Sequence, residues 1–258
     1  MELFETLGFR WNRESIPREL PRASIERVVF RFRSMLAEYV WDAGVLEGNP
    51  FTFPEVKTLL EGVTVGGHKL SDEEQILNLG KASNYLLDLV SHREFTLVKS
   101  TFCSLHALVA QTEALEWVVT EPSAARLNPG AARLNQVFAA GVRSLEQNVS
   151  NPFERAASFF LFGSLQQIFF DGNKRTSRFM MNGILMTEGI DAISIPAIRA
   201  AEFNSRMVEF YTNRDADEMM AFVLDCHPEI VQIRKLAPGL SAIQDLPVIK
   251  YTRLGEPT

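Results

Sequence analysis

Apolar residues recur every three or four positions through most of the chain, which is the spacing of one face of an α-helix. Over residues 23–45, for example, Ile25, Val28, Phe32 and Val40 follow this spacing. The same pattern predicts helices over residues 52–60, 71–91, 95–111, 131–148, 152–167, 179–188, 199–212 and 216–225. Because helical periodicity covers nearly the whole chain, we expect an all-α fold.

The helix predicted over residues 152–167 is apolar on nearly every side, so it should be the buried central helix. Residues 1–20 contain a mainly polar stretch with prolines and are expected to form an irregular lead-in. Pro228 is expected to end the last clear helix. Residues 229–258 have weak periodicity, which favours a loosely held tail with room for one short helix.

Composition narrows the class of protein. The 258 residues are 46% hydrophobic, which is enough for a sizeable core. Acidic residues outnumber basic ones by 32 to 26, and the formal charge of -6 argues against a general nucleic-acid-binding surface. The two cysteines, Cys103 and Cys226, form no disulfide framework, which favours a reducing, cytoplasmic setting. The start of the sequence lacks the pattern of a signal peptide, and no run of about 20 apolar residues predicts a membrane span.

The segment from Gln167 to Arg178 has the strongest chemical pattern in the chain. It combines an acidic residue, a Gly-Asn pair and three cations: Asp171, Gly172, Asn173, Lys174, Arg175 and Arg178. A loop that runs into a helix N-terminus offers backbone N–H groups and a positive dipole end to a phosphate. A carboxylate beside such phosphates could hold a divalent cation, because hard oxygen ligands suit Mg²⁺. The alternative interpretation is a solvated basic helix start that is capped by Asn173 or Asp171.

This segment resembles the signature loop of the Fic (Fido) family, whose pattern is His-x-Phe-x-(Asp/Glu)-Gly-Asn-(Gly/Lys)-Arg-x-x-Arg. The matching positions are Phe169, Asp171, Gly172, Asn173, Lys174, Arg175 and Arg178. The first position departs from the pattern, because Gln167 stands where the family has its histidine.

A second stretch resembles Fic proteins that have an N-terminal inhibitory helix, which carry the motif (Ser/Thr)-x-x-x-Glu-(Gly/Asn). Residues 46–55 follow the fuller local pattern of these proteins, Ile-Glu-Gly-Asn-x-(Leu/Met)-Thr-x-x-Glu. Glu47 occupies the glutamate position, and Ala43 replaces the Ser or Thr. The resemblance implies that Glu47 pairs with Arg178 and blocks the place of a nucleotide γ-phosphate.

The family's activity is implied by the same resemblance. Fic enzymes transfer a nucleotide monophosphate, usually AMP from ATP, to a hydroxyl of a target protein, so ATP with Mg²⁺ is the expected cofactor. The resemblance assigns Mg²⁺ to Asp171, the anion-binding turn to Gly172, Asn173 and Lys174, the inner phosphates to Arg175 and the γ-phosphate to Arg178. A lysine at position 174 also occurs in the related Doc-type kinases, which bind the nucleotide the other way round, so the mode of nucleotide binding stays open.

Because Gln167 stands at the histidine position, the residue that would accept a proton from the target hydroxyl is missing. An amide can orient a hydroxyl but has no site of useful basicity, and losing a general base costs about 10²–10⁴-fold in rate. The four histidines, His68, His92, His106 and His227, are distant in sequence, and His106 is expected to be buried because it lies in an apolar helix.

Three hypotheses are consistent with the sequence. The first is a degenerate Fic protein that binds a nucleotide but is weak or inactive in transfer. The second is an active nucleotidyltransferase or Doc-like kinase. The third is a regulatory or interaction scaffold without enzymatic activity.

The resemblance also divides the chain. It implies an N-terminal helical segment with Glu47 over residues 1–62, a Fic core over 63–225 and a tail over 226–258. A short β-hairpin flap that docks the target protein is implied near residues 117–120, and a plain connecting loop is the alternative. The N-terminal helix could contact a partner protein or form a homodimer.

Overall fold

The computed structural model describes residues 2–111 and 131–236. In these ranges the chain is helical and contains no β-strand beyond an isolated bridge between Arg10 and Asp215. The predicted all-α class is therefore confirmed. The α-helices are α1 (Glu2–Leu7), α2 (Ile25–Ser34), α3 (Leu36–Leu46), α4 (Phe53–Leu60), α5 (Leu70–Ser91), α6 (Lys99–Val109), α7 (Ala131–Asn148), α8 (Pro152–Gln166), α9 (Asn173–Thr187), α10 (Ala200–Asn213), α11 (Asp217–Asp225) and α12 (Pro228–Leu236), with 3₁₀ helices at η1 (Arg13–Ser15) and η3 (Ala197–Arg199).

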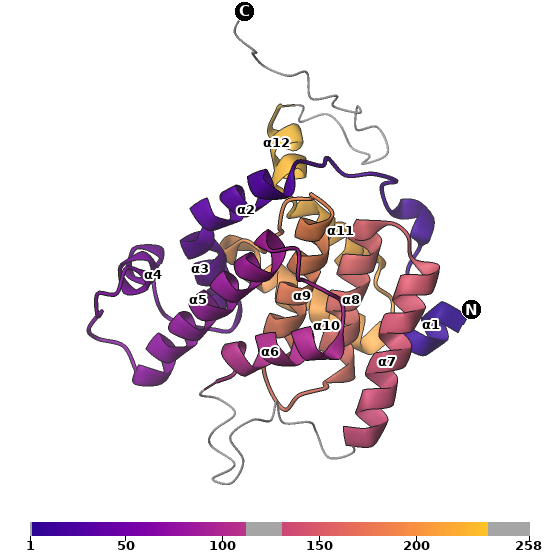
Figure 1. Cartoon of the computed structure of the whole chain (residues 1–258), viewed down its shortest axis with the longest axis horizontal. Helices are drawn as coiled ribbons and strands as arrows, with labels where there is room; N and C mark the ends of the chain where they lie inside the picture. Colours follow the sequence, from indigo (N-terminus) through magenta and orange to yellow (C-terminus); the bar gives the residue numbers. More distant parts are fainter. Residues whose placement is uncertain (1, 112–130, 237–258) are drawn as a thin grey trace, which may run out of the picture.

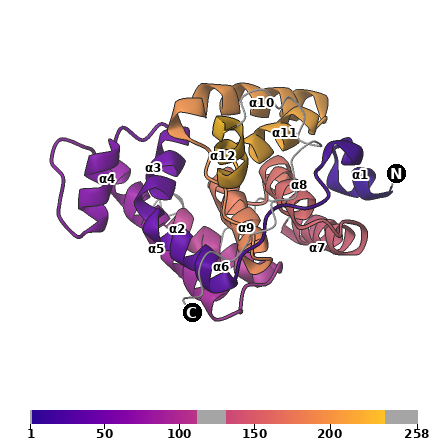
Figure 2. The same cartoon turned by 90° about the horizontal axis from the view of Figure 1, so that it is seen from above.

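The core is built around α8 and α9, which lie side by side at the centre of the molecule (Figures 1 and 2). The expectation that residues 152–167 form a buried helix is confirmed, because nearly all of α8 is buried. Asn151 caps this helix by accepting a hydrogen bond from the Glu154 N–H at 3.0 Å, and Pro152 takes the first helical position, where a missing N–H costs nothing. The helices α5, α6 and α2 pack against α9, and α7 and α11 pack against α8.

The prediction of a single helix over residues 23–45 is wrong, because two helices, α2 and α3, occupy that range. The chain breaks at Met35, whose backbone has φ -106° and ψ 12°. In an unbroken helix, residues 32 and 39 would be separated by about 10 Å along the axis. The break instead stacks the rings of Phe32 and Tyr39 with centroids 4.5 Å apart. Tyr39 also donates a hydrogen bond to the Ala192 carbonyl at 2.8 Å, so a tertiary contact outweighs the local helical pattern.

The expectation of an irregular lead-in over residues 1–20 is also wrong in part. The first residues form α1, which packs against α7, and Leu7, Phe9 and Trp11 are buried in the core. The Trp11 indole donates to the Glu154 carboxylate at 2.9 Å. Polar residues around these three apolar anchors mask the pattern in the sequence, since a six-residue helix shows little periodicity.

Pro228 begins α12 and does not end the helical series, in keeping with the preference of proline for a first helical position. The predicted tail therefore contains one short helix up to Leu236, and Ile230 in that helix is buried. The hairpin expected near residues 117–120 lies outside the described residues. Among the helices that the structure describes, none is long and apolar enough to cross a membrane.

Candidate functional site

The connection between α8 and α9 is a turn of six residues, 167–172. It begins at Gln167, whose backbone adopts a left-handed conformation with φ 46°, and it ends at Gly172, where φ is 73°. The predicted start of the helix at Phe179 is wrong, because α9 already begins at Asn173. Lys174, Arg175 and Arg178 therefore lie on the first two turns of a helix and not in a loop.

Asn173 stabilises this turn through the hydrogen bonds of its side chain. Its side-chain oxygen accepts a hydrogen bond from the Phe169 N–H at 2.9 Å, and its amide donates to the Phe169 carbonyl at 2.7 Å. The Asn173 amide also lies 3.3 Å from the side-chain oxygen of Gln167. The N-cap position belongs to Gly172, and no side-chain hydrogen bond caps it. The alternative interpretation, in which Asn173 or Asp171 caps a plain helix start, does not describe this geometry.

Phe169 anchors the turn to the core. Its ring is buried and stacks on His106 of α6 with centroids 3.6 Å apart. The His106 Nε2 lies 2.9 Å from the Asp171 carbonyl oxygen, and since a carbonyl only accepts, this nitrogen carries the proton and donates. A side chain at position 172 would meet Ala110 at 3.3 Å, so α6 lies close behind the glycine.

His106 was predicted to be buried, and the structure confirms this. Its contact with the turn was not predicted, because 65 residues separate it from Asp171. The sequence offered one signal: a single histidine within an apolar helix needs a hydrogen-bond partner.

Asp171 is the exposed carboxylate of the turn, with its side chain 66% accessible. It accepts hydrogen bonds from the Gly172 N–H and from Arg175 Nη2, the latter at 3.2 Å. The described residues contain no group of three or more His, Cys, Asp or Glu side chains that could hold a metal. A lone exposed carboxylate fits Mg²⁺, which keeps several waters and takes its other ligands from substrate phosphates.

Arg178 lies in the second turn of α9, and its side chain is only 9% exposed. Its Nη2 donates to Glu47 Oε1 at 3.2 Å, and the second Glu47 oxygen lies 3.6 Å from the Lys174 ammonium. Burial lowers the pKa of the Arg178 guanidinium, and the Glu47 carboxylate opposes that shift. The expected pairing of Glu47 with Arg178 is thus present.

The end of α3 explains how Glu47 reaches this place. Gly48 adopts φ 81°, and the Asn49 N–H donates back to the Gly44 carbonyl at 3.0 Å, so the helix ends in a left-handed C-terminal turn. Asn49 then bonds the Asp72 carbonyl and Gln75 of α5, which fixes the turn against the body of the protein. A carboxylate at a helix C-terminus is unfavourable against the dipole, and the two cations of α9 compensate for it.

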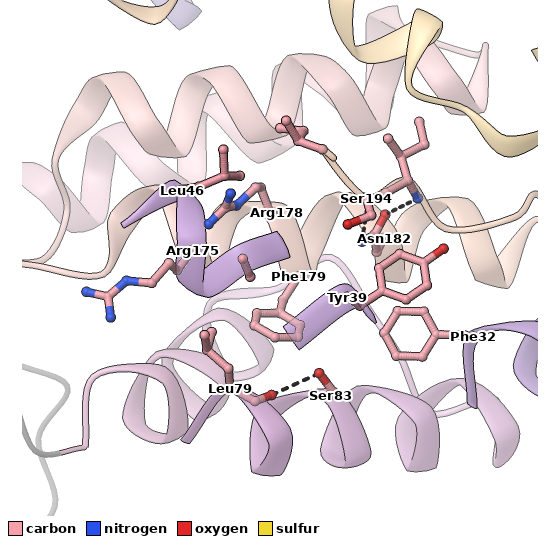
Figure 3. A pocket seen from close by; sticks show the side chains of 13 residues that line it. Phe32, Tyr39, Leu46, Leu79, Ser83, Arg175, Arg178, Phe179, Asn182 and Ser194 are labelled. Carbon is pink, nitrogen blue, oxygen red and sulfur yellow. Dashed lines mark hydrogen bonds between the residues drawn. The ribbon is translucent and has the colours of Figure 1, made fainter. Parts of the chain in front are cut away.

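A small cavity of about 40 Å³ lies beside Arg178. Figure 3 shows Arg178 and Leu46 at one end of it and the stacked Phe32 and Tyr39 at the other. This volume holds a few water molecules at most, so the cavity is too small for a nucleotide.

Known proteins resemble this chain in sequence and in fold. Residues 94–185 match the model of the Fic/DOC family, a range that includes α6, α8, the turn and nearly all of α9. The chain contains a Fic domain. It is 26% identical over 220 residues to a protein adenylyltransferase Fic of Drosophila grimshawi and 22% identical over 218 residues to that of Drosophila mojavensis. Each match covers 81% of this chain but only 44% and 42% of the relative, so the chain spans less than half the length of these proteins.

Solved structures share the fold of this Fic domain. Fic-1 from C. elegans superposes with a TM-score of 0.61 at 21% identity, over 84% of this chain and 66% of that one. A Fic domain-containing signaling protein from Bacteroides thetaiotaomicron has a TM-score of 0.59 at 16% identity, over 91% and 90% of the two chains. At these identities the likeness establishes the fold alone.

Gln167 of the Fic domain is exposed and held in place by its own side chain. Its amide donates to the Ser164 carbonyl at 2.6 Å, and its oxygen faces Asn173. Among the other histidines, His106 is engaged with the Asp171 carbonyl, and His68 stacks on Phe51 at 3.8 Å. Neither takes the role of a base beside Gln167.

Proposed function

We propose that this Fic domain binds ATP with Mg²⁺ at the turn before α9 and that its transfer of AMP to protein hydroxyls is weak or absent. Gly172, Asn173 and Lys174 would receive the phosphates at the helix N-terminus, where the dipole and the backbone N–H groups favour anions. Arg175 and Arg178 would add guanidinium forks that suit phosphate oxygens. Asp171 would hold the Mg²⁺, which offsets the charge of the phosphates.

The Arg178–Glu47 contact carries this proposal. A buried guanidinium is costly unless an anion accompanies it, and here the anion comes from the end of a different helix. A carboxylate held against an arginine beside an N-terminal turn stands where an anionic ligand would bind. We infer that Glu47 competes with a ligand phosphate for Arg178 and that the described state is inhibited.

Gln167 accounts for the proposed lack of transfer. When a hydroxyl oxygen attacks the α-phosphorus, the bond to pyrophosphate breaks and the hydroxyl proton must pass to a base. The Gln167 amide is not such a base, and its side chain is occupied in holding the turn. Active AMP transfer remains the second candidate, favoured by the similarity to the Drosophila adenylyltransferases.

Calorimetric titration with ATP and Mg²⁺ tests the binding site. Glu47→Gly should tighten binding by about tenfold or more, which corresponds to about 1.4 kcal/mol. Glu61→Gly is the matched control, because Glu61 also follows the last residue of a helix, α4, and precedes a left-handed glycine, Gly62. Absence of ATP binding to both the wild-type protein and Glu47→Gly would overturn the proposal.

The missing base is tested by labelling with ATP that carries a radioactive α-phosphate. Glu47→Gly alone should bind ATP without transferring label to protein, whereas Gln167→His with Glu47→Gly should label itself or an added protein. Histidine tolerates the left-handed backbone of position 167 better than most residues. Rapid labelling by Glu47→Gly alone would show that Gln167 does not limit transfer and would favour the second candidate.

A further inference from the structure

The first turn of α9 has an unusual set of charges. Lys174 and Arg175 are the second and third residues of this helix, and its first turn contains no acidic residue. A cation at a helix N-terminus is unfavourable against the helix dipole, so an anion nearby stabilises it. Arg175 has the carboxylate of Asp171 at 3.2 Å. For Lys174 the anion is Glu47, which comes from the end of α3.

Glu47 therefore bridges two cations of the same helix. Its Oε1 accepts a hydrogen bond from Arg178 Nη2 at 3.2 Å, and its Oε2 lies 3.6 Å from Lys174 Nζ. Residues 174 and 178 are four positions apart, so they are neighbours on the surface of α9 and one carboxylate can reach both. Each oxygen of Glu47 thus has a cation of its own.

Packing holds the two cations to different degrees. The Arg178 side chain is only 9% exposed, and its guanidinium carbon lies 5.9 Å from the centre of the Phe203 ring. The Lys174 side chain is 32% exposed. Arg178 therefore fixes the carboxylate where Lys174 reaches it, whereas the flexible stem of Lys174 allows the ammonium group to turn toward another anion.

The two cations also have different assignments in the proposed nucleotide site. Arg178 is assigned to the γ-phosphate, which ADP lacks, and Lys174 is assigned to the turn that receives the phosphates of ADP and ATP alike. If Glu47 acted through Arg178 alone, it would not affect the binding of ADP. Because Glu47 also engages Lys174, a diphosphate on the turn must replace it as the partner of the ammonium group.

We propose that Lys174 extends the inhibition by Glu47 from ATP to nucleoside diphosphates, and that it thereby determines which ligands Glu47 excludes. In the described state Glu47 neutralises Lys174. When a diphosphate occupies the turn, the Lys174 ammonium group leaves Glu47 and pairs with a phosphate oxygen. The inference rests on the proposed function, since it requires that phosphates bind at the turn before α9.

Calorimetric titration with ADP and Mg²⁺ tests this role in the full chain. The four proteins are the wild type, Glu47→Gly, Lys174→Met and the double variant. Methionine keeps the helix propensity and an unbranched side chain but removes the charge. Glu47→Gly should tighten ADP binding about threefold when Lys174 is present, the size expected of a partly exposed ion pair, and should leave it unchanged in the Lys174→Met background.

Two results would overturn the role of Lys174. An equal gain in both backgrounds would mean that Glu47 repels the phosphates directly. No gain in either background, with ATP binding still tightened by Glu47→Gly, would mean that Glu47 acts through Arg178 alone. If neither ADP nor ATP binds to any of the four proteins, the proposed function fails and this inference fails with it.

Two further variants separate the charge of Lys174 from its packing. Lys174→Arg keeps the charge and should retain the threefold gain in ADP affinity on Glu47→Gly. Lys99→Met is the matched control, because Lys99 is an exposed lysine in the first turn of another helix, α6, and the gain should persist in that background. Loss of the gain in Lys174→Arg or in Lys99→Met would contradict a specific effect of the charge at position 174.

Discussion

Glu47 and Arg178 are 131 residues apart in the chain, yet their side chains lie 3.2 Å apart, and both are largely buried. The contact joins the end of α3 to the second turn of α9. Its formation depends on the left-handed Gly48, which turns the chain sharply after Glu47. Breaking this pair is therefore expected to change both the stability of the fold and the affinity for a nucleotide.

Replacing Arg178 tests how much the pair contributes to stability. Arg178→Ala leaves the partly buried Glu47 with Lys174 alone, at 3.6 Å, and should lower the free energy of unfolding by about 1–3 kcal/mol. Arg178→Lys keeps the charge but loses the fork and should be destabilising by less. Urea unfolding of the wild-type protein, Arg178→Lys and Arg178→Ala measures the order of their stabilities. Equal stability of Arg178→Ala and the wild-type protein would show that the pair contributes nothing.

Gly172→Ala should damage the turn itself. The residue has φ 73°, where an alanine is strained by about 1 kcal/mol, and its methyl group would approach Ala110 at 3.3 Å. We expect lower thermal stability and a loss of ATP affinity. Gly66→Ala is the control, because Gly66 lies in open space without a positive φ. A Gly172→Ala protein as stable as Gly66→Ala would contradict a requirement for glycine at position 172.

His106 is expected to position the turn through its hydrogen bond to the Asp171 carbonyl. His106→Phe keeps a ring against Phe169 but removes that bond, which costs about 1 kcal/mol of stability and should weaken ATP binding several-fold. His68→Phe is the matched control, because His68 also stacks on a phenylalanine and bonds a neighbour, Glu55, away from the site. If both variants change ATP affinity equally, His106 has no positioning role.

His227 should make stability depend on pH. Burial lowers its folded pKa to about 4, whereas the unfolded value is about 6.5. The unfolded chain therefore binds the proton first as pH falls, and the stability that neutral His227 contributes is lost between about pH 6.5 and 4, by about 3 kcal/mol at most. The raised pKa of Asp191 acts in the opposite direction, so the comparison must be between variants.

The measurement is urea unfolding from pH 4 to 7. His227→Gln should flatten this part of the pH profile relative to the wild-type protein, whereas His92→Gln, at an exposed position, should leave it unchanged. Identical profiles for the wild-type protein and His227→Gln would contradict a neutral buried imidazole.

The sequence was sufficient for elements whose pattern is local. The apolar period predicted α5, α7 and α8 within a few residues of their observed ends, and the signature segment predicted a turn that contains Asp171 and Gly172 before a helix. The contact between Glu47 and Arg178 came from resemblance to a family and not from periodicity, because nothing local links α3 to α9.

Other features depend on tertiary contacts that leave no periodic trace. The break at Met35 follows from the stacking of Phe32 on Tyr39, and the burial of Trp11 depends on Glu154. His106 could be expected to be buried, but its partner Asp171 is fixed only when α6 packs behind the turn. The early start of α9 at Asn173 was missed because polar residues occupy its first turns.

A double-mutant cycle on ATP affinity tests most directly whether Glu47 competes with a phosphate for Arg178. The wild-type protein, Glu47→Gly, Arg178→Ala and the double variant are titrated with ATP and Mg²⁺ by calorimetry. We predict that Glu47→Gly tightens binding by about tenfold when Arg178 is present and has little effect when it is alanine, a coupling of about 1.4 kcal/mol. An equal gain in both backgrounds, or no binding by any of the four proteins, would contradict the account.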